Sequence, residues 1–167
     1  MNTALIIVTI LSIIYFGVAI YKAKRIPESI SETSYIWEQG CTTPVDKNGP
    51  HKAYLFSFYC ALVAGLMFWP WMSQTRENIE FLCFLGCAGI LAAAVTPFFK
   101  EKYQAPVHYG GGMVAVISWF VWMLCMKHVI ELAAALIVLF FLIECKKESY
   151  VFWTEIVGLV TLILCLL

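Results

Sequence analysis

Several side chains of this sequence are of the types that transfer protons or bind polar ligands, and they lie where apolar runs begin or end. Glu155 is the most informative of them, because it lies within the apolar stretch 150–167. A carboxyl group at membrane depth normally faces a partner or a water-filled cavity. A histidine beside a carboxylate suits acid–base work, and histidines with carboxylates also bind metal ions. The candidate ligand-binding residues are Ser31, Glu32, Tyr35, His51, His108 and Glu155.

Several of these residues also have a purely structural interpretation. His108 follows Pro106 at a predicted helix entrance, where a histidine commonly caps the helix or forms a hydrogen bond. Ser29, with Glu32 three residues later, matches a helix capping box. Glu155 is expected to be shielded and paired, either with His108 or with a group of the first loop, because an unsatisfied polar group in hydrocarbon is costly.

The composition is that of a membrane protein. Of 167 residues, 62% are hydrophobic and 13% are charged, whereas a soluble domain is about half apolar and about a quarter charged. Lysine plus arginine and aspartate plus glutamate balance at 11 each, so no net charge recruits nucleic acid. The seven cysteines are an odd number, scattered mostly in apolar runs, which does not indicate a disulfide framework. We expect no resident metal or other cofactor.

Apolar runs recur along the chain, and a helix needs about 20 apolar residues to cross a bilayer. We therefore predict an all-α, polytopic membrane protein with a single transmembrane domain, residues 1–167, in which short loops make antiparallel neighbours. The six predicted spans are residues 3–21, 53–72, 79–99, 106–126, 129–143 and 150–167. Pairs of small residues predict close helix contacts; they are Ala61 with Gly65, Ala88 with Ala92, and Gly111 with Ala115.

The basic residues are distributed unevenly between the two sides of such a bundle. Two of them, Arg76 and Lys127, lie on the side of the termini, and nine lie in or beside the first, third and fifth loops. Because lysine and arginine stay cytoplasmic, both termini are expected outside the membrane, which we take to be a bacterial inner membrane. The nine are Lys22, Lys24, Arg25, Lys47, Lys52, Lys100, Lys102, Lys146 and Lys147.

The first loop, residues 24–52, is the longest, and a long loop in a compact protein is usually functional or disordered. Its first half, residues 28–39, is predicted as a short helix on the membrane surface, with Ile36 and Trp37 as apolar anchors. Under the predicted topology this loop shares one leaflet with His108 and Glu155. Polar side chains that converge at one depth are what a headgroup or small-substrate pocket needs.

The order of these features is itself informative. Ile30-Ser31-Glu32 follows the first span, the small-rich stretch 89–97 ends the third, and His108 opens the fourth. This order resembles the six-helix DRAM/Sfk/FGF-receptor-activating-protein-like membrane superfamily and its bacterial relatives of unknown function. The resemblance covers nearly the whole chain in architecture and rests on short motifs. It implies a role in the handling of membrane lipids.

Three classes of function remain open. We expect foremost a lipid-interacting membrane protein, with a pocket in the cytoplasmic leaflet lined by Ser31, Glu32, His108 and Glu155. One alternative is a membrane-embedded, metal-dependent hydrolase that uses His51, His108 and a carboxylate. Another is a small transporter or channel subunit in which Glu155 carries a proton or cation. The expected partners are membrane lipids, and a second copy of the chain or another membrane protein.

Overall fold

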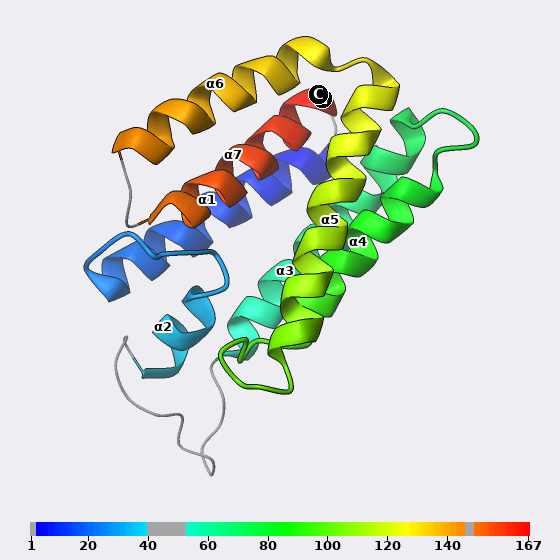
Figure 1. Cartoon of the computed structure of the whole chain (residues 1–167). Coiled ribbons are helices and arrows are strands. Elements are labelled where there is room, and N and C mark those ends of the chain that lie inside the picture. The colour runs from blue at the N-terminus through cyan, green and yellow to red at the C-terminus, as the bar shows by residue number, and fades with distance from the viewer. Residues whose placement is uncertain (1–2, 40–52, 146–148) are drawn as a thin grey trace.

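The structure is a computed structural model, and it describes residues 3–39, 53–145 and 149–167. Helices make up nearly all of this part of the chain. These residues form seven helices and no strand, so the all-α prediction is confirmed (Figure 1). The six long helices lie within or close to the predicted ranges. The helices are α1 (Thr3–Ala23), α2 (Thr33–Gln39), α3 (Tyr54–Gln74), α4 (Phe81–Ala94), α5 (Ala105–Met126), α6 (Val129–Cys145) and α7 (Tyr150–Cys165).

The helices differ in their capacity to cross a membrane. Among the described residues, three helices, α1, α3 and α5, are long and apolar enough to do so. α4 and α7 are apolar but shorter. The 14 residues of α4 rise by about 21 Å, less than the ~30 Å of a bilayer core. α4 ends early because of Pro97. The proline ring clashes with the residue before it, here Thr96, when that residue adopts helical backbone angles. The six-span antiparallel bundle therefore stays a prediction.

The most extensive helix contact is between α4 and α5, where two glycines face each other. A Cβ atom on Gly89 would lie 2.5 Å from the Gly111 carbonyl oxygen, and one on Gly111 would lie 2.7 Å from the Gly89 carbonyl oxygen. The predicted contact at Gly111 and Ala115 is confirmed, because Ala115 also lies against Gly89. The predicted contact at Ala61 and Gly65 is wrong, because both residues are exposed and nothing lies within 4 Å of a Cβ placed on Gly65.

Large aromatic side chains join α3 to its neighbours. Trp71 on α3 and Trp122 on α5 meet edge to face, with buried side chains and ring centroids 5.8 Å apart. Tyr15 on α1 stacks on Tyr59 of α3, with centroids 4.1 Å apart. Aromatic pairs of this kind contribute about 0.5–1.5 kcal/mol each beyond the area that they bury. They fix α3 against both α1 and α5.

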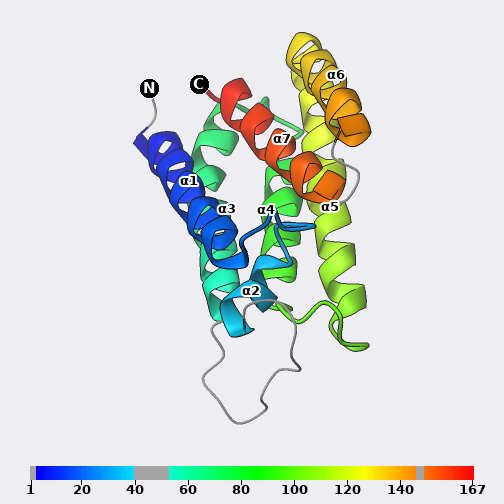
Figure 2. The ribbon, with the colours of Figure 1, turned by 90° about the vertical axis from the view of Figure 1, so that its left-hand side faces the viewer.

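α6 lies at the edge of the molecule in both views (Figures 1 and 2). It packs mainly on α7, and its buried residues are Leu132 and Ala135. Most of its remaining side chains are apolar and exposed. Such a surface suits contact with lipid or with another membrane helix.

The two ends of the molecule carry different elements. The beginning of α1 and the end of α7 lie at the end opposite α2 (Figure 2). The loop between α4 and α5 reaches the same end as α2 in both views. Of the polar residues singled out from the sequence, those that the structure describes gather near this second end, around the segment that leads from α1 into α2.

Candidate functional site

The last helix is tied to the segment that follows the first helix. Glu155 of α7 accepts a hydrogen bond through Oε2 from the backbone N–H of Ile30, with 2.5 Å between nitrogen and oxygen. In the opposite direction, the backbone N–H of Phe152 donates to the carbonyl oxygen of Glu28 at 2.9 Å. The prediction that Glu155 has a polar partner in the first loop is confirmed, and that partner is a backbone group.

Ser31 and His108 are in direct contact. Ser31 Oγ lies 2.7 Å from His108 Nε2, and His108 Nδ1 lies 2.8 Å from the carbonyl oxygen of Thr96. A carbonyl oxygen only accepts, so Nδ1 carries the proton and, in the neutral ring, Nε2 accepts from the Ser31 hydroxyl. Phe99 stacks on the imidazole with ring centroids 5.1 Å apart. His108, which is 4% exposed, is thus held from three directions.

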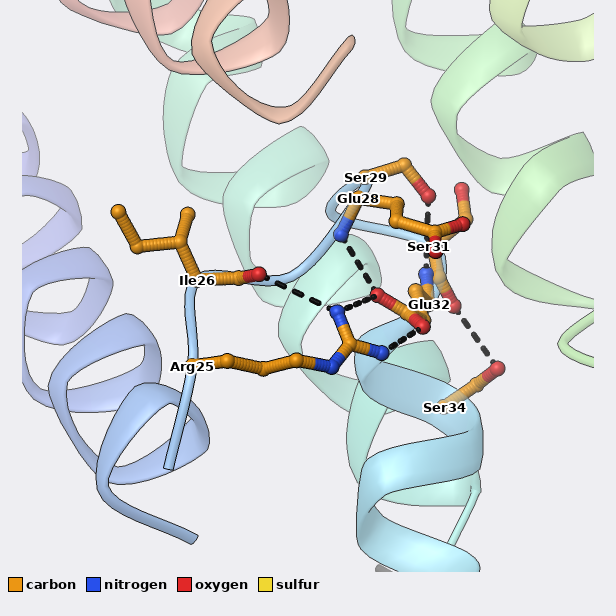
Figure 3. Close-up of polar contacts among 7 residues, drawn as sticks. All are labelled: Arg25, Ile26, Glu28, Ser29, Ser31, Glu32 and Ser34. Atoms are coloured by element: carbon orange, nitrogen blue, oxygen red, sulfur yellow. Dashed lines mark hydrogen bonds and ion pairs between the residues drawn. The ribbon is translucent and has the colours of Figure 1, made fainter. Parts of the chain in front are cut away.

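A capped turn fixes the backbone that precedes α2 (Figure 3). Ser29 Oγ accepts a hydrogen bond from the Glu32 N–H at 3.1 Å, as the predicted capping box requires. The Glu32 carboxylate accepts from the N–H of Glu28 at 2.6 Å, whereas a capping box would use the Ser29 N–H. Arg25 binds the two carboxylate oxygens through its two Nη atoms, at 2.6 and 3.2 Å. Glu32 therefore stabilises the turn itself.

The first turn of α2 is attached to the loop between α4 and α5. The Ser34 hydroxyl donates to the carbonyl oxygen of Pro97 at 2.7 Å, and the Tyr35 hydroxyl accepts from the Lys100 N–H at 2.9 Å. The Lys100 ammonium also lies over the Tyr35 ring, 5.2 Å from its centroid. Partial burial raises the pKa of the Tyr35 phenol above its usual value, so this hydroxyl is neutral at physiological pH.

A second group of polar contacts connects α1 to α2 and to α3. These contacts were not predicted from the sequence. The Tyr15 hydroxyl lies 2.6 Å from Thr33 Oγ1 and accepts from the Trp37 indole N–H at 2.9 Å. The hydroxyls of Ser12 and Tyr59 lie 3.0 Å apart. The available signal was the pair of polar side chains, Ser12 and Tyr15, one turn apart in an apolar span.

The predicted surface helix is present in part. The capped turn and α2 together cover residues 29–39, so this half of the loop is helical in character. Ile36, predicted as an anchor in lipid, is instead 0% exposed within the protein. Trp37 likewise contacts Tyr15, with ring centroids 5.6 Å apart. The segment therefore packs on the helices through its apolar side chains. We use the name docked segment for residues 26–36, which include the capped turn and the first residues of α2.

The structure brings some of the predicted site residues together and places others apart. Ser31 contacts His108, and Glu155 binds the backbone of the residue beside Ser31. Glu32 and Tyr35 bind groups on other sides of the docked segment. His51 lies outside the described residues.

A shallow hollow of about 550 Å³, largely open to the outside, lies next to the docked segment at the end of α1. It shares Arg25 and Ile26 with the network of the capped turn, where Arg25 Nη1 donates to the Ile26 carbonyl oxygen at 3.2 Å. None of the described residues predicted for the site lines it. The described residues that do so are Ile20, Tyr21, Lys22, Lys24, Arg25 and Ile26.

Metal-ligating side chains are dispersed over the described part of the chain. Within residues 3–39, 53–145 and 149–167, no group of three or more His, Cys, Asp or Glu side chains is placed to hold a metal ion. His128 and Glu131 form a separate pair, with 3.5 Å between Nδ1 and Oε1, and Trp122 stacks on His128.

Comparison of the chain with protein-family models, with curated proteins and with solved structures found no match.

Proposed function

We propose that this chain is a multi-pass membrane protein that binds the headgroup of an anionic lipid beside the docked segment. The observation that carries the proposal is the hollow at the end of α1, whose described lining combines three cationic side chains with two isoleucines and a tyrosine. Cations beside apolar side chains match a lipid whose phosphate lies at the interface and whose acyl chain lies along a helix.

The charges at the hollow support an anionic ligand over a neutral one. Arg25 is paired with Glu32, so its charge is balanced. The Lys22 ammonium donates to the Trp37 carbonyl oxygen and lies over the Trp37 ring, and neither of these two contacts supplies a negative charge. Lys24 adds a further positive charge in the lining. Counted over the residues that the structure describes, the lining is therefore net positive.

The proposal includes the predicted six spans, with both termini outside and the docked segment at the cytoplasmic leaflet. The support is the nine-to-two division of basic residues between the two sides of the bundle. That leaflet is also the one with the more anionic lipids, so the hollow and its proposed ligand share one side of the membrane. The lipid handling that the superfamily resemblance implies agrees with this placement.

The proposal is tested by native mass spectrometry of the full chain in a non-ionic detergent, titrated with dioctanoyl phosphatidylglycerol or dioctanoyl phosphatidylcholine. Retention of the anionic lipid should exceed that of the zwitterionic one. Lys24→Gln should weaken retention of the anionic lipid by about fivefold, because one lysine near an anionic surface contributes about 1 kcal/mol. Added salt should lower retention in the same direction.

Lys127→Gln is the matched control. It removes the same charge at the C-terminal end of α5, on the side of the membrane opposite the proposed lipid site. It should leave retention of both lipids unchanged. Equal retention of the two lipids by the wild-type chain would contradict the proposal, as would equal losses in Lys24→Gln and Lys127→Gln.

A further inference from the structure

Ser31 and His108 form a pair that the proposed lipid binding does not use. The two side chains come from the docked segment and from α5, 77 positions apart in the sequence, and their polar atoms lie 2.7 Å apart. We propose that Ser31 is a nucleophile activated by His108, and that the pair transfers the acyl group of a carboxylic ester to water. The inference rests on the proposed function only for the expected substrate, an ester of a membrane lipid.

The orientation of the imidazole is the first support. Nδ1 donates to the Thr96 carbonyl oxygen, which fixes the tautomer and directs the unprotonated Nε2 at the Ser31 hydroxyl. A nucleophile, a base within hydrogen-bond reach and a third group that orients the base are the parts that an activated serine requires. The stacked Phe99 ring holds the plane of the imidazole.

The backbone around the hydroxyl is the second support. In the described part of the chain, the N–H groups of the docked segment are largely used: those of Glu28, Ile30 and Glu32 have acceptors. The N–H of Ser31, like that of Ser29, makes no hydrogen bond with any described residue, and only that of Ser31 belongs to a residue whose hydroxyl contacts a base. A donor on the nucleophile itself is well placed to stabilise the oxyanion of a tetrahedral intermediate.

The surroundings indicate the chemical class of the substrate. The imidazole is covered by Phe99 and Phe56, with ring centroids 5.1 and 6.0 Å from its own, and both phenyl rings are buried, so they shield the base from water. Ser31 itself is partly exposed. The ester must therefore approach from the side of the Ser31 hydroxyl, and beside apolar helices an ester with an apolar acyl chain fits better than a charged or strongly hydrated one.

The reaction needs no participant other than water. The Ser31 Oγ attacks the ester carbonyl carbon while its proton passes to His108 Nε2. The ester C–O bond breaks, the leaving alcohol takes that proton, and the acyl group remains on Oγ. Water then attacks the acyl carbon with His108 accepting a proton, and the Oγ–C bond breaks to release the carboxylic acid and restore the hydroxyl.

The direct test uses the full-length wild-type chain in non-ionic detergent and an alkyl fluorophosphonate, which phosphonylates activated serines with loss of fluoride. Peptide mass spectrometry should place the adduct on Ser31. The hydroxyls of Ser29 and Ser34 serve as internal controls, since they bond backbone groups, and they should stay unmodified. An unmodified Ser31 in the folded protein would overturn the inference without the need for any variant.

Variants separate a nucleophile from a merely structural serine. His108→Gln keeps a polar side chain but removes the base, and it should slow labelling by at least about a hundredfold, the lower range of general-base effects. Labelling at an unchanged rate in a folded His108→Gln chain would overturn the role of the base. Ser31→Cys supplies a second variant of similar volume, whose reaction with iodoacetamide should be faster than that of the exposed Cys125.

Two substrates distinguish the possible sources of the ester. Release of fatty acid from phosphatidylglycerol vesicles containing the protein would identify a lipid ester, and hydrolysis of p-nitrophenyl butyrate alone would identify a soluble one. Labelling of Ser31 with turnover of neither ester would overturn acyl transfer. Equal retention of the anionic and the zwitterionic lipid by a chain whose Ser31 is labelled would contradict the proposed lipid site and support the nucleophile.

Discussion

The carboxylate of Glu155 and the backbone N–H of Ile30 are joined by a hydrogen bond across 125 positions of sequence. Because the Phe152 N–H donates back to Glu28, two bonds of opposite direction connect α7 to the docked segment. This connection places the sixth long helix next to residues that also touch α5 and the loop between α4 and α5. Through this contact the docked segment, which directly follows α1, links the first helix to the last.

Replacing Glu155 should reveal whether this bond needs a charge or only an acceptor. Glu155→Gln keeps a carbonyl oxygen for the Ile30 N–H, so the free energy of unfolding should change little. Glu155→Leu removes the acceptor, and the unsatisfied N–H should cost about 1–3 kcal/mol. Unfolding of the two variants in the same detergent measures the difference. Equal destabilisation by both changes would mean that the negative charge itself is required.

The ion pair of Arg25 and Glu32 should contribute unequally through its two partners. Glu32→Ala removes the acceptor for the Glu28 N–H as well as for Arg25, so it should lower the free energy of unfolding by about 1–3 kcal/mol. Arg25→Ala should cost less, because the Arg25 side chain is 42% exposed and that of Glu32 is 9% exposed. A double-mutant cycle should give a coupling of about 1 kcal/mol. No measurable coupling would show that solvent screens the pair completely.

The crossing of α4 and α5 should tolerate no added methyl group. Gly89→Ala and Gly111→Ala each place a Cβ against backbone atoms of the other helix, so each should lower the free energy of unfolding by about 1–3 kcal/mol. Gly65→Ala is the matched control, since nothing lies within 4 Å of its new Cβ. Thermal unfolding should therefore separate the first two variants from the third. Similar melting temperatures for all three would contradict the close crossing.

The predicted orientation is open to cysteine labelling in intact cells. A single cysteine at Lys102, in the loop beside α2, should react only after the membrane is permeabilised. A single cysteine at Lys127, which ends α5 at the opposite side, should react with an impermeant maleimide from outside. The exposed Cys125 and Cys145, and Cys41 of the first loop, must first be replaced by serine. The reverse pattern would overturn the orientation and the assignment of the docked segment to the cytoplasmic leaflet.

The sequence was most informative about where helices occur. It was least informative about which atoms of neighbouring helices and loops contact one another. Continuous apolar runs with short polar breaks predict helix positions, because burial and backbone hydrogen bonding act together within each run. The end of α4 was misplaced, since the effect of Pro97 on the preceding residue outweighed the apolar run that continues to Phe99. Small-residue spacing was an unreliable guide: Ala92 lies against Gly111, whereas Ala88 is exposed.

The grouping of the polar residues was predictable from shared depth, but their partners were not. Ser31 and His108 were placed in one leaflet by topology, and they do meet. Glu155 and Ser34 bind backbone groups, of Ile30 and Pro97, which every residue carries and which no side-chain pattern marks. The choice of Arg25 as the partner of Glu32 depends on the direction in which the chain leaves α1, which only the structure supplies.

The connection between α7 and the docked segment has a consequence for which substitutions the chain can accept. Position 28 contributes its carbonyl oxygen to Phe152 and its N–H to Glu32, while its side chain is exposed. Most amino acids should therefore be interchangeable there in a saturation library, with proline excluded because it lacks the N–H. Position 30 should reject proline for the same reason, through the bond to Glu155. Variation in natural or selected sequences would thus conceal the importance of this turn, and only its intolerance of proline would reveal it.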